Sequence, residues 1–510
     1  MELSVSEKIK SVSSLGELVD SLKSQGKTVA HCHGVFDILH PGHIRHLESA
    51  KKHGDILVVT ITPDRYVNKG PSRPVFPDAL RSEVLASLSV VDFVAVNEWP
   101  TAVEALKAIK ANRFVKGSDY KDAKKDVTGG ILREREAIES VGGELVFTDE
   151  ITFSSSSLAN NAMSLYSAET TEFLKNFREK HTEEDLLSSI NQTSDCRALV
   201  LGDAIIDEYH YVTPMGKSPK ENVIVTRFQS EETFAGGVLA AANHVASLCA
   251  QVDLVTCLGR ENSYEDFITK NLKKNINPTF ITRTDSPTIV KRRFVEPSYT
   301  RKLFEVAFIN GEYLPEDAEA KLLAHLEKVL PDYDMVLVTD FGHGMITPKV
   351  IDLLCEKAKF LAVNAQTNSA NTGYNLITKY PRADYVCIDE PEARLALHDK
   401  VSSIEEIIKK LGDEVKAKRV TITRGNNGCL VYTPGKGTYK VPVFTNRVVD
   451  TVGAGDAFLS ITSPCVAMGV PMDQVGFIGN AAGAMKVQIV GNRSSIDKVP
   501  LQKFITTLMK

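Results

Sequence analysis

The chain has 510 residues, which is more than one hydrophobic core usually serves, so its length predicts two or three domains. Its composition, 43% hydrophobic and 25% charged, is that of an ordinary globular protein. The net charge of −5 argues against a broad nucleic-acid-binding surface, because such a surface needs a basic excess to neutralise phosphates.

Residues 1–10 (MELSVSEKIK) lack the apolar core of a secretory signal, and no apolar run approaches the ~18 residues that span a bilayer. The eight cysteines form no C-x-x-C pair, and several lie inside apolar, strand-like runs. This pattern favours buried, reduced thiols over a disulfide framework. We therefore expect a cytoplasmic protein with neither a membrane nor a nucleic-acid partner.

Short apolar runs alternate with amphipathic stretches along the whole chain, which predicts an α/β fold built on parallel sheets. Helical patterns lie between these runs, as in residues 43–53 (HIRHLESAKKH) and 184–191 (EDLLSSIN). The candidate strands are residues 28–37, 54–62, 91–96, 197–203, 252–259, 334–340, 360–365, 384–389 and 419–425.

A polar stretch near the middle of the chain, residues 161–195, carries two short helical patterns. Thr182 is the expected N-cap of the second one. We therefore predict a first domain at residues 1–160, a helical linker at 161–195 and a second domain at 196–510.

Residues 33–43 (HGVFDILHPGH) follow the first strand and open a helix. Backbone amides and the helix dipole at such an end favour phosphate oxygens, and Gly42 lets the backbone approach a ligand closely. His40 and His43 can then donate hydrogen bonds to a pentacoordinate α-phosphate and to departing pyrophosphate, which is electrostatic rather than covalent catalysis. Asp37 either orients one of these histidines or fixes the turn.

A zinc site is the alternative interpretation of this segment. Its ligands would come from His31, Cys32 and His33 together with the two histidines of the helix start. Residues 31 and 33 share one face of a strand, whereas Cys32 points to the other face. The spacing fits no common zinc pattern, so we favour phosphate chemistry.

From residue 25 to about residue 160 the chain resembles the cytidylyltransferase-like nucleotidyltransferase family. Further matches point to the branch that activates heptose 1-phosphate, and they are residues 69–75 (KGPSRPV), Arg81, 91–101 (VDFVAVNEWPT) and 115–120 (VKGSDY). The resemblance implies a Rossmann-like domain in which Lys69, Arg73 and Lys116 bind nucleotide and sugar phosphates. Arg81 is either a further such residue or a structural one.

The same resemblance implies that the nucleotide pocket also includes Gly34, Phe36, Asp37 and Gly42. A four-serine run occupies the place of a Ser/Thr-rich segment that opens the family's last helix. Ser155 and Ser156 would bind the triphosphate there, and capping of that helix is the alternative. Adenylyl- and cytidylyltransferases share the HxGH motif, so the nucleotide is ATP or CTP.

Residues 450–458 (DTVGAGDAF) carry glycines directly before a helical run. The amides of Gly453, Ala454 and Gly455 would form an anion hole at the helix start. Asp456 would accept the proton of a substrate hydroxyl as that hydroxyl attacks the γ-phosphate of ATP. The chain has no G-x-x-x-x-G-K-[ST] pattern, so the prediction of a kinase rests on this different anion hole.

This motif resembles that of the ribokinase-like (PfkB) carbohydrate kinases, and supporting matches run from about residue 196 to the end. The resemblance implies a ribokinase-like α/β domain with sugar-binding residues at Asp203, Asp207, Gly236, Gly237, Asn243 and Asp340. For the three aspartates, capping or turn formation is the alternative role, although ligands bind where strands of open α/β sheets end. The implied ATP-binding residues are Thr423, Gly425, Gly428, Asn480, Asp389 and Glu392.

The order of the motifs is most similar to that of heptose-phosphate kinases, with two departures. That branch has Asp-Pro-Lys where this chain reads Asn364-Ala365-Gln366, and Asn-x-x-Glu where it has Asp389 and Glu392. Asp389 can still hold a Mg²⁺-bound water, and Glu392 would contact Mg²⁺ through water. The known bifunctional heptose enzyme also carries its kinase first, so the domain order is reversed here.

Together these motifs predict a bifunctional enzyme that makes a nucleotide-activated sugar. A kinase would phosphorylate a heptose-like sugar or sugar phosphate with ATP and Mg²⁺. A nucleotidyltransferase would join a sugar phosphate to a second NTP, ATP or CTP, with release of pyrophosphate. Both resemblances imply a homodimer. The alternatives are that only one domain is catalytic, or that the transferase acts as a cytidylyltransferase on a polyol phosphate.

Overall fold

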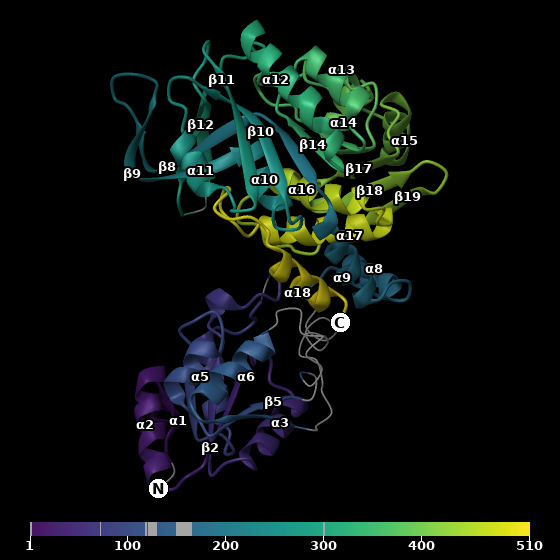
Figure 1. The fold of residues 1–510 in the computed structure, drawn as a ribbon. Helices are drawn as coiled ribbons and strands as arrows, with labels where there is room; N and C mark the ends of the chain where they lie inside the picture. The colour runs from purple at the N-terminus through teal and green to yellow at the C-terminus, as the bar shows by residue number, and fades with distance from the viewer. Residues whose placement is uncertain (1–2, 72, 118–119, 121–129, 149–165, 299–300) are drawn as a thin grey trace. The chain divides into compact units, whose positions relative to one another are not determined.

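The chain divides into two units in a computed structural model, which describes residues 3–71, 73–117, 120, 130–148, 166–298 and 301–510 (Figure 1). The first unit is Met1–Ser167 with Gln502–Lys510, and the second is Ala168–Leu501. Residues 502–510, which the sequence assigns to the second domain, thus group with the first unit. Among the described residues, no helix is long and apolar enough to cross a bilayer.

The first unit is built on a six-stranded parallel sheet with strand order β1-β4-β3-β2-β5-β6. Because the order reverses beside β2, a crevice is expected at its carboxyl end, where ligands of doubly wound sheets bind. The strands are β1 Ile9–Lys10, β2 Val29–Gly34, β3 Ile56–Ile61, β4 Phe93–Val96, β5 Arg113–Lys116 and β6 Glu144–Phe147.

Helices cover both faces of this sheet because successive strand residues point to opposite sides. Val29 and Val58 face a core that includes α2 and α5, whereas Ala30 and Leu57 face α3 and α4. The helices are α1 Val5–Lys8, α2 Val12–Ser24, α3 Pro41–Lys51, α4 Asp78–Ala86, α5 Val103–Ile109 and α6 Gly130–Ser140. The predicted Rossmann-like arrangement is confirmed.

The last helix, α18 (Lys498–Leu508), contributes its end to the first unit. There the fully buried ring of Phe504 packs directly against Gly70, at a distance that leaves no room for a Cβ atom. Gly70 also has a left-handed φ of 93°, so only glycine suits this position.

The second unit has a nine-stranded sheet with order β11-β10-β7-β14-β15-β16-β17-β18-β19. Its strands are parallel from β11 to β17, and β18 and β19 add an antiparallel edge. The strands are β7 Ala198–Gly202, β10 Val252–Gly259, β11 Ile276–Arg283, β14 Met335–Asp340, β15 Leu361–Ala365, β16 Tyr385–Asp389, β17 Arg419–Thr423, β18 Cys429–Thr433 and β19 Gly437–Val441.

Helices α12 to α15 cover one face of this sheet, and α10, α16 and α17 lie against the other (Figure 1). Val336 and Val338 of β14 belong to the core under α12 and α13. The helices are α10 Val238–Val245, α11 Glu265–Asn271, α12 Glu316–Val329, α13 Pro348–Lys357, α14 Glu390–Ala396, α15 Ile404–Glu414, α16 Ala454–Ala467 and α17 Met472–Lys486.

A second, four-stranded sheet with order β13-β12-β8-β9 belongs to the same unit. Its strands are β8 Ala204–Lys217, β9 Ile224–Gly237, β12 Ile289–Glu296 and β13 Arg301–Phe308. Pairing in register sets Lys291 of β12 beside Asp207 of β8. Ile205, Asp207, Lys291 and Arg293 therefore point to one face of this sheet, as residues two apart in a strand do.

Two helices precede the nine-stranded sheet, namely α8 (Ala168–Arg178) and α9 (Glu183–Asn191). They lie in the stretch that the sequence predicts as a linker, but they pack on the second unit: the ring of Phe177 stacks on that of Phe477 at 4.4 Å. Thr182 caps α9 through the N–H of Asp185, as expected.

Candidate active sites

The HxGH segment lies where β2 ends and α3 begins. His40 is the N-cap of α3, and its Nδ1 accepts a hydrogen bond from the N–H of Gly42 at 3.1 Å. The ring proton of a neutral His40 is therefore on Nε2. The rings of His40 and His43 lie 4.0 Å apart between centroids. The structure thus brings both predicted catalytic histidines to one helix start.

Both histidines are held in the neutral form. Burial, together with His40 and Lys69, lowers the pKa of His43 to about 3. Burial and Lys69 also lower the pKa of His40. A neutral imidazole can donate one hydrogen bond to a phosphate oxygen without adding a charge, which is the electrostatic role expected from the sequence.

The basic loop after β3 lies against the same helix start. Arg73 forms an ion pair with Asp37 at 3.1 Å, and its Nη2 is buried without a hydrogen-bond partner among the described residues. Burial and Arg73 lower the pKa of Lys69 to about 8, against the opposing effect of Asp37. Two closely spaced cations with an unmet donor suit a polyphosphate.

Asp37 holds this loop in place. Its buried carboxylate accepts hydrogen bonds from the N–H groups of Val75 (2.6 Å) and Phe76 (3.2 Å) as well as from Arg73. Of the two roles considered from the sequence, this geometry supports fixing the turn. Beside it, Phe36 has a left-handed φ of 50° and lies 5.4 Å from the ring of His43. Such backbone strain in a non-glycine residue is typical of ligand sites.

Arg81 is a structural residue in this geometry. It is 2% exposed, and it donates to the carbonyl oxygens of Val35 (2.5 Å), Thr62 (2.9 Å) and Phe76 (2.9 Å) and to Asp64 (2.5 Å). All its nitrogens are thus committed to the protein.

Lys116 is buried at the end of β5, where its Nζ lies 2.9 Å from Glu134 and over the ring of Tyr120. Gly34 lies close under the ring of Phe36, at the end of β2. Ser155 and Ser156 lie outside the described residues.

Two of the residues considered as zinc ligands make hydrogen-bond contacts within the protein. His31 and His33 both contact the hydroxyl of Thr60, at 2.7 and 2.8 Å. Within the part of the chain that the structure describes, no three His, Cys, Asp or Glu side chains cluster as metal ligands would.

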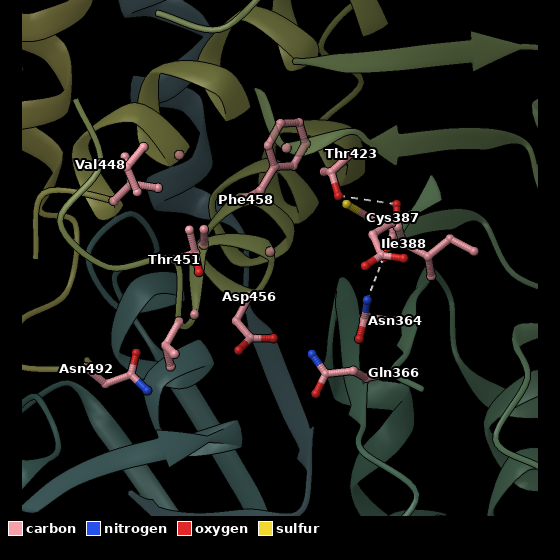
Figure 2. A pocket seen from close by; sticks show the side chains of 18 of the residues that line it. Asn364, Gln366, Cys387, Ile388, Thr423, Val448, Thr451, Asp456, Phe458 and Asn492 are labelled. Atoms are coloured by element: carbon pink, nitrogen blue, oxygen red, sulfur yellow. Dashed lines mark hydrogen bonds between the residues drawn. The ribbon is translucent and has the colours of Figure 1, made fainter. Parts of the chain in front are cut away.

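The second site is a cavity of about 500 Å³ at the start of α16 in the second unit. Gly453 is the N-cap of α16, with a left-handed φ of 74°, and Gly453, Ala454 and Gly455 all line the cavity. Figure 2 shows the carboxylate of Asp456 pointing into this space, opposite Asn364 and Gln366. The predicted anion hole and base are therefore together in one cavity.

The pKa of Asp456 is compatible with its predicted role as a general base. Burial raises its pKa to about 6, helped by Asp207, while Lys486 and Lys291 act in the opposite direction. A carboxylate with a pKa near the working pH is ionised yet basic enough to take a proton in the transition state.

All six residues predicted to bind ATP line the cavity. Asp389 caps α14 through the N–H of Glu392, and Glu392 accepts in return from the N–H of Asp389. Burial and Asp389 raise the pKa of Glu392 to about 8. The other four of these six residues are Thr423, Gly425, Gly428 and Asn480.

Of the residues predicted to bind the sugar, Asp207 and Gly237 line the cavity, and Asp207 forms an ion pair with Arg293. Gly236 does not line it, but a Cβ there would collide with the carboxylate of Asp207, so this glycine makes room for Asp207. Lys291 and Arg293 also line the cavity, and the motif comparison missed both. Their alternation in the run KRRF of a β-strand is the signal that could have found them.

Three residues that the sequence predicts to bind the sugar make hydrogen bonds or ion pairs within the protein instead. Asp203 accepts from the N–H groups of His343 and Met345, both at 3.3 Å. Asp340 is 1% exposed and bonds Tyr380 and Lys379. These contacts match the alternative role of turn formation.

The third of these residues, Asn243, lies outside the cavity. It bonds the backbone of Asn271 and Lys273 and lines a separate hollow. The structure therefore does not bring Asp203, Asp340 or Asn243 into the lining of the cavity.

Two family models match the chain. The pfkB family carbohydrate kinase model matches residues 197–499, and the cytidylyltransferase-like model matches residues 31–162. The order of the two domains, with the transferase first, is the one expected from the motifs. Each of the two matched segments contains one of the two sites described above.

Curated relatives match the chain in part. The bifunctional protein HldE of Haemophilus influenzae (strain PittEE) is 27% identical over 314 residues, 61% of this chain and 63% of that protein. The protein of the same name from Campylobacter fetus subsp. fetus is 44% identical over 133 residues, 26% and 29% of the two chains. The chain thus aligns with less than two thirds of the length of these relatives.

Among solved structures, the phosphofructokinase-2 of Escherichia coli in complex with substrates and products superposes with a TM-score of 0.51. The match covers 62% of this chain and all of the other, at 15% sequence identity. At that identity the likeness shows the fold alone, and the predicted ribokinase-like α/β fold of the second unit is confirmed.

Proposed function

Because the chain belongs to the pfkB family of carbohydrate kinases and carries a cytidylyltransferase-like domain ahead of the kinase, we propose that it makes a nucleotide-activated sugar in two separate reactions. The observation that carries this proposal is that each unit holds one cluster of the predicted phosphate-binding residues at the start of a helix. One has Asp456 beside an anion hole, and the other has His40 and His43 at a helix start. The heptose-like motifs of both halves favour a heptose or a closely related sugar.

In the kinase reaction, Asp456 takes the proton of the acceptor hydroxyl as its oxygen attacks the γ-phosphorus of ATP. The new O–P bond forms while the bond to the β-phosphate oxygen breaks, and ADP leaves. The amides of Gly453, Ala454 and Gly455 receive the charge that develops on the transferred group. These residues act by position and charge, with no covalent intermediate on the protein.

Asp389 and Glu392 fit the requirements of Mg²⁺, which prefers hard oxygen ligands and keeps several of its waters. Burial and Asp389 raise the pKa of Glu392, and burial and Glu390 raise that of Asp389, so a cation nearby would favour the ionised forms of both carboxylates. Mg²⁺ held there would neutralise charge on the ATP phosphates.

The acceptor of the kinase is proposed to be a sugar phosphate rather than a neutral sugar. Lys291 and Arg293 line the cavity beside Asp207. Arg293 is paired with Asp207, whereas the pKa of Lys291 is lowered mainly by burial. A half-buried ammonium group in a binding cavity favours a ligand that brings its own negative charge.

In the transferase reaction, a phosphate oxygen of the sugar phosphate attacks the α-phosphorus of an NTP, and pyrophosphate leaves. His40 and His43 donate hydrogen bonds to the oxygens of the pentacoordinate α-phosphate, and Lys69 and Arg73 hold the leaving pyrophosphate. The heptose-like flanks of this domain favour ATP over CTP as the second nucleotide. If the pathway follows the heptose precedent, a separate phosphatase acts between the two reactions.

The test uses the full chain and two variants, Asp456→Ala and His40→Ala. Each is incubated with heptose phosphates and other sugar phosphates plus ATP, and with sugar 1-phosphates plus ATP or CTP, and products are identified by mass spectrometry. We expect each variant to lose one reaction and keep the other. Retention of both reactions by both variants would refute the assignment of the two sites.

The homodimer belongs to the same proposal, by resemblance to both families. Sedimentation velocity of the full chain measures it directly, and a monomer at all concentrations would contradict it.

A second candidate function follows from the altered loops of the kinase, where Asn364 and Asp389 replace the residues of the heptose branch. In this alternative the kinase domain binds nucleotide without turnover, and the transferase is the one active centre. Binding of Mg·ATP in calorimetry, with no phosphoryl transfer to any acceptor, would favour it. Transfer of a CMP group from CTP to a polyol phosphate would instead identify the transferase as a cytidylyltransferase that acts on polyol phosphates.

A further inference from the structure

Lys486 is a buried cation behind the anion hole. It is the last residue of α17, its exposed fraction is 0%, and lysines are almost never fully buried unless they are paired. Its Nζ donates to the carbonyl oxygens of Val452 (2.8 Å) and Gly491 (2.6 Å). The lysine therefore joins the loop before α16 to the turn that follows α17.

The ammonium group lies directly against the anion hole. A Cβ built on Gly453 would lie 3.2 Å from Cε and 3.4 Å from Nζ of Lys486. Burial lowers the pKa of Lys486, while Asp450, Asp456 and Asp207 act in the opposite direction. Its position at a helix C-terminus favours the charged form as well.

The hydrogen bond to Val452 sets the direction of a catalytic amide. In a trans peptide unit the carbonyl and the following N–H point in opposite directions. Because the carbonyl of Val452 points at Lys486, the N–H of Gly453 points away from it. Gly453 itself lines the cavity, and Asp450 holds the same loop by accepting from the N–H of Val452 at 3.1 Å.

We infer that Lys486 is a positioning residue for phosphoryl transfer, whose ammonium group orients the anion-hole loop through backbone carbonyls and supplies a positive charge behind it. This inference rests on the kinase activity proposed above. Lys486 does not touch the substrate; it acts through the peptide units on either side of Gly453.

The atoms around the ammonium group determine what kind of hole forms when the side chain of Lys486 is removed. Two carbonyl oxygens face it, and the Oδ1 atom of Asn492, buried without a partner among the described residues, lies beside Gly453. Truncation to alanine would leave a hole lined with oxygens. Such a hole suits a small monovalent cation, whereas methionine would fill the space without supplying a charge.

The test compares the full chain with its variants Lys486→Ala and Lys486→Met, and with Lys440→Met as the matched control. Lys440 is an exposed lysine paired with Glu169, and it does not line the cavity. Thermal unfolding is followed in ammonium, potassium and tetramethylammonium chloride at equal ionic strength. Phosphoryl transfer is measured in the same salts.

We expect K486A alone to gain thermal stability in ammonium or potassium over tetramethylammonium, since only a cation that fits the hole binds the folded state. Its kcat should fall at least tenfold with the KM for ATP within about twofold, and ammonium should restore part of it. K486M should lose kcat equally and respond to no cation.

The inference is overturned if K486M keeps the kcat of the unaltered chain, or if K486A shows no difference among the three salts. Should K486A fail to fold, K486M decides by its kcat, because it keeps the volume. If the unaltered chain phosphorylates no acceptor, the proposed kinase function fails, and the salt dependence of K486A unfolding still decides whether Lys486 fills a cation site.

Discussion

The hydroxyl of Tyr209 donates a hydrogen bond to Oδ2 of Asp450 at 2.9 Å, and so ties strand β8 of the four-stranded sheet to the first residue of the anion-hole loop. Lys302 of β13 binds the other oxygen of Asp450 at 2.6 Å. Asp450 in turn accepts from the N–H groups of Val452 and Gly491. The sheet that carries Lys291 and Arg293 is therefore linked to the loop that receives the phosphoryl group.

Tyr209→Phe should lower the kcat of the kinase by about tenfold. Tyr209 is fully buried, and loss of its hydroxyl removes one of the bonds that orient Asp450, worth about 1–1.5 kcal/mol. Tyr211→Phe is the control, since its hydroxyl donates to Glu232 instead. Steady-state kinetics measure both, and equal effects of the two variants would contradict this role.

The kinase rate should fall as the pH drops below about 6, because Asp456, whose pKa burial raises to about 6, must be ionised to accept a proton. The same raised pKa also lowers the stability of the folded state at neutral pH. The folded state binds the proton more tightly than the unfolded state, so stability decreases as the pH rises from about 4 to 6.

Asp456→Asn should therefore be inactive yet more stable above pH 7, by up to about 3 kcal/mol for a shift of about two units. Denaturant unfolding at pH 5 and 8 measures the difference. A variant less stable than the unaltered chain at pH 8 would show that the ionised carboxylate is stabilised in the fold.

Lys291→Met should raise the KM for a phosphorylated acceptor at least tenfold and leave the KM for ATP within about twofold, because it removes a charge-assisted hydrogen bond to the acceptor phosphate. Arg292→Met is the matched control, since Arg292 points to the other face of β12 and pairs with Glu208. Unphosphorylated sugars should be unaffected by either change. An unchanged KM for every phosphorylated acceptor would exclude Lys291 from that role.

Phe504→Ala should impair the transferase and spare the kinase. It leaves a cavity beside Gly70, and such large-to-small changes in a core cost about 3–5 kcal/mol. Lys69 would lose the support of its neighbouring turn, so the KM for the NTP should rise. Val499→Ala, on a partly exposed position of the same helix, is the control. Transferase kinetics unchanged in F504A would show that the helix end only stabilises the unit.

The sequence predicted those parts of the sites that are local. The segment around Asp456 and the one around His40 each contain their own turn, cap and helix start, so a short run of residues determines the geometry. The alternation of strands and helices likewise predicted both α/β units. Asp389 and Glu392 were found for the same reason, because they form a capping box within one helical turn.

Residues whose role depends on distant partners were not predictable in this way. Asp340 ends a strand, as a ligand-binding aspartate would, but Lys379 and Tyr380, some forty positions later, take up its carboxylate. Lys291 enters the cavity because β12 pairs in register with β8, and Lys486 because α17 ends behind the anion hole. No local pattern encodes such pairings.

The grouping of Gln502–Lys510 with Met1–Ser167 makes the first catalytic unit discontinuous in the sequence. During synthesis the ribosome completes the whole kinase before it releases the residues that pack on Gly70. The transferase core can form early, but its last contacts wait until residues 502–510 have been synthesised. A shortened gene ending before residue 502 would thus encode both sets of catalytic motifs and still yield an unfinished transferase.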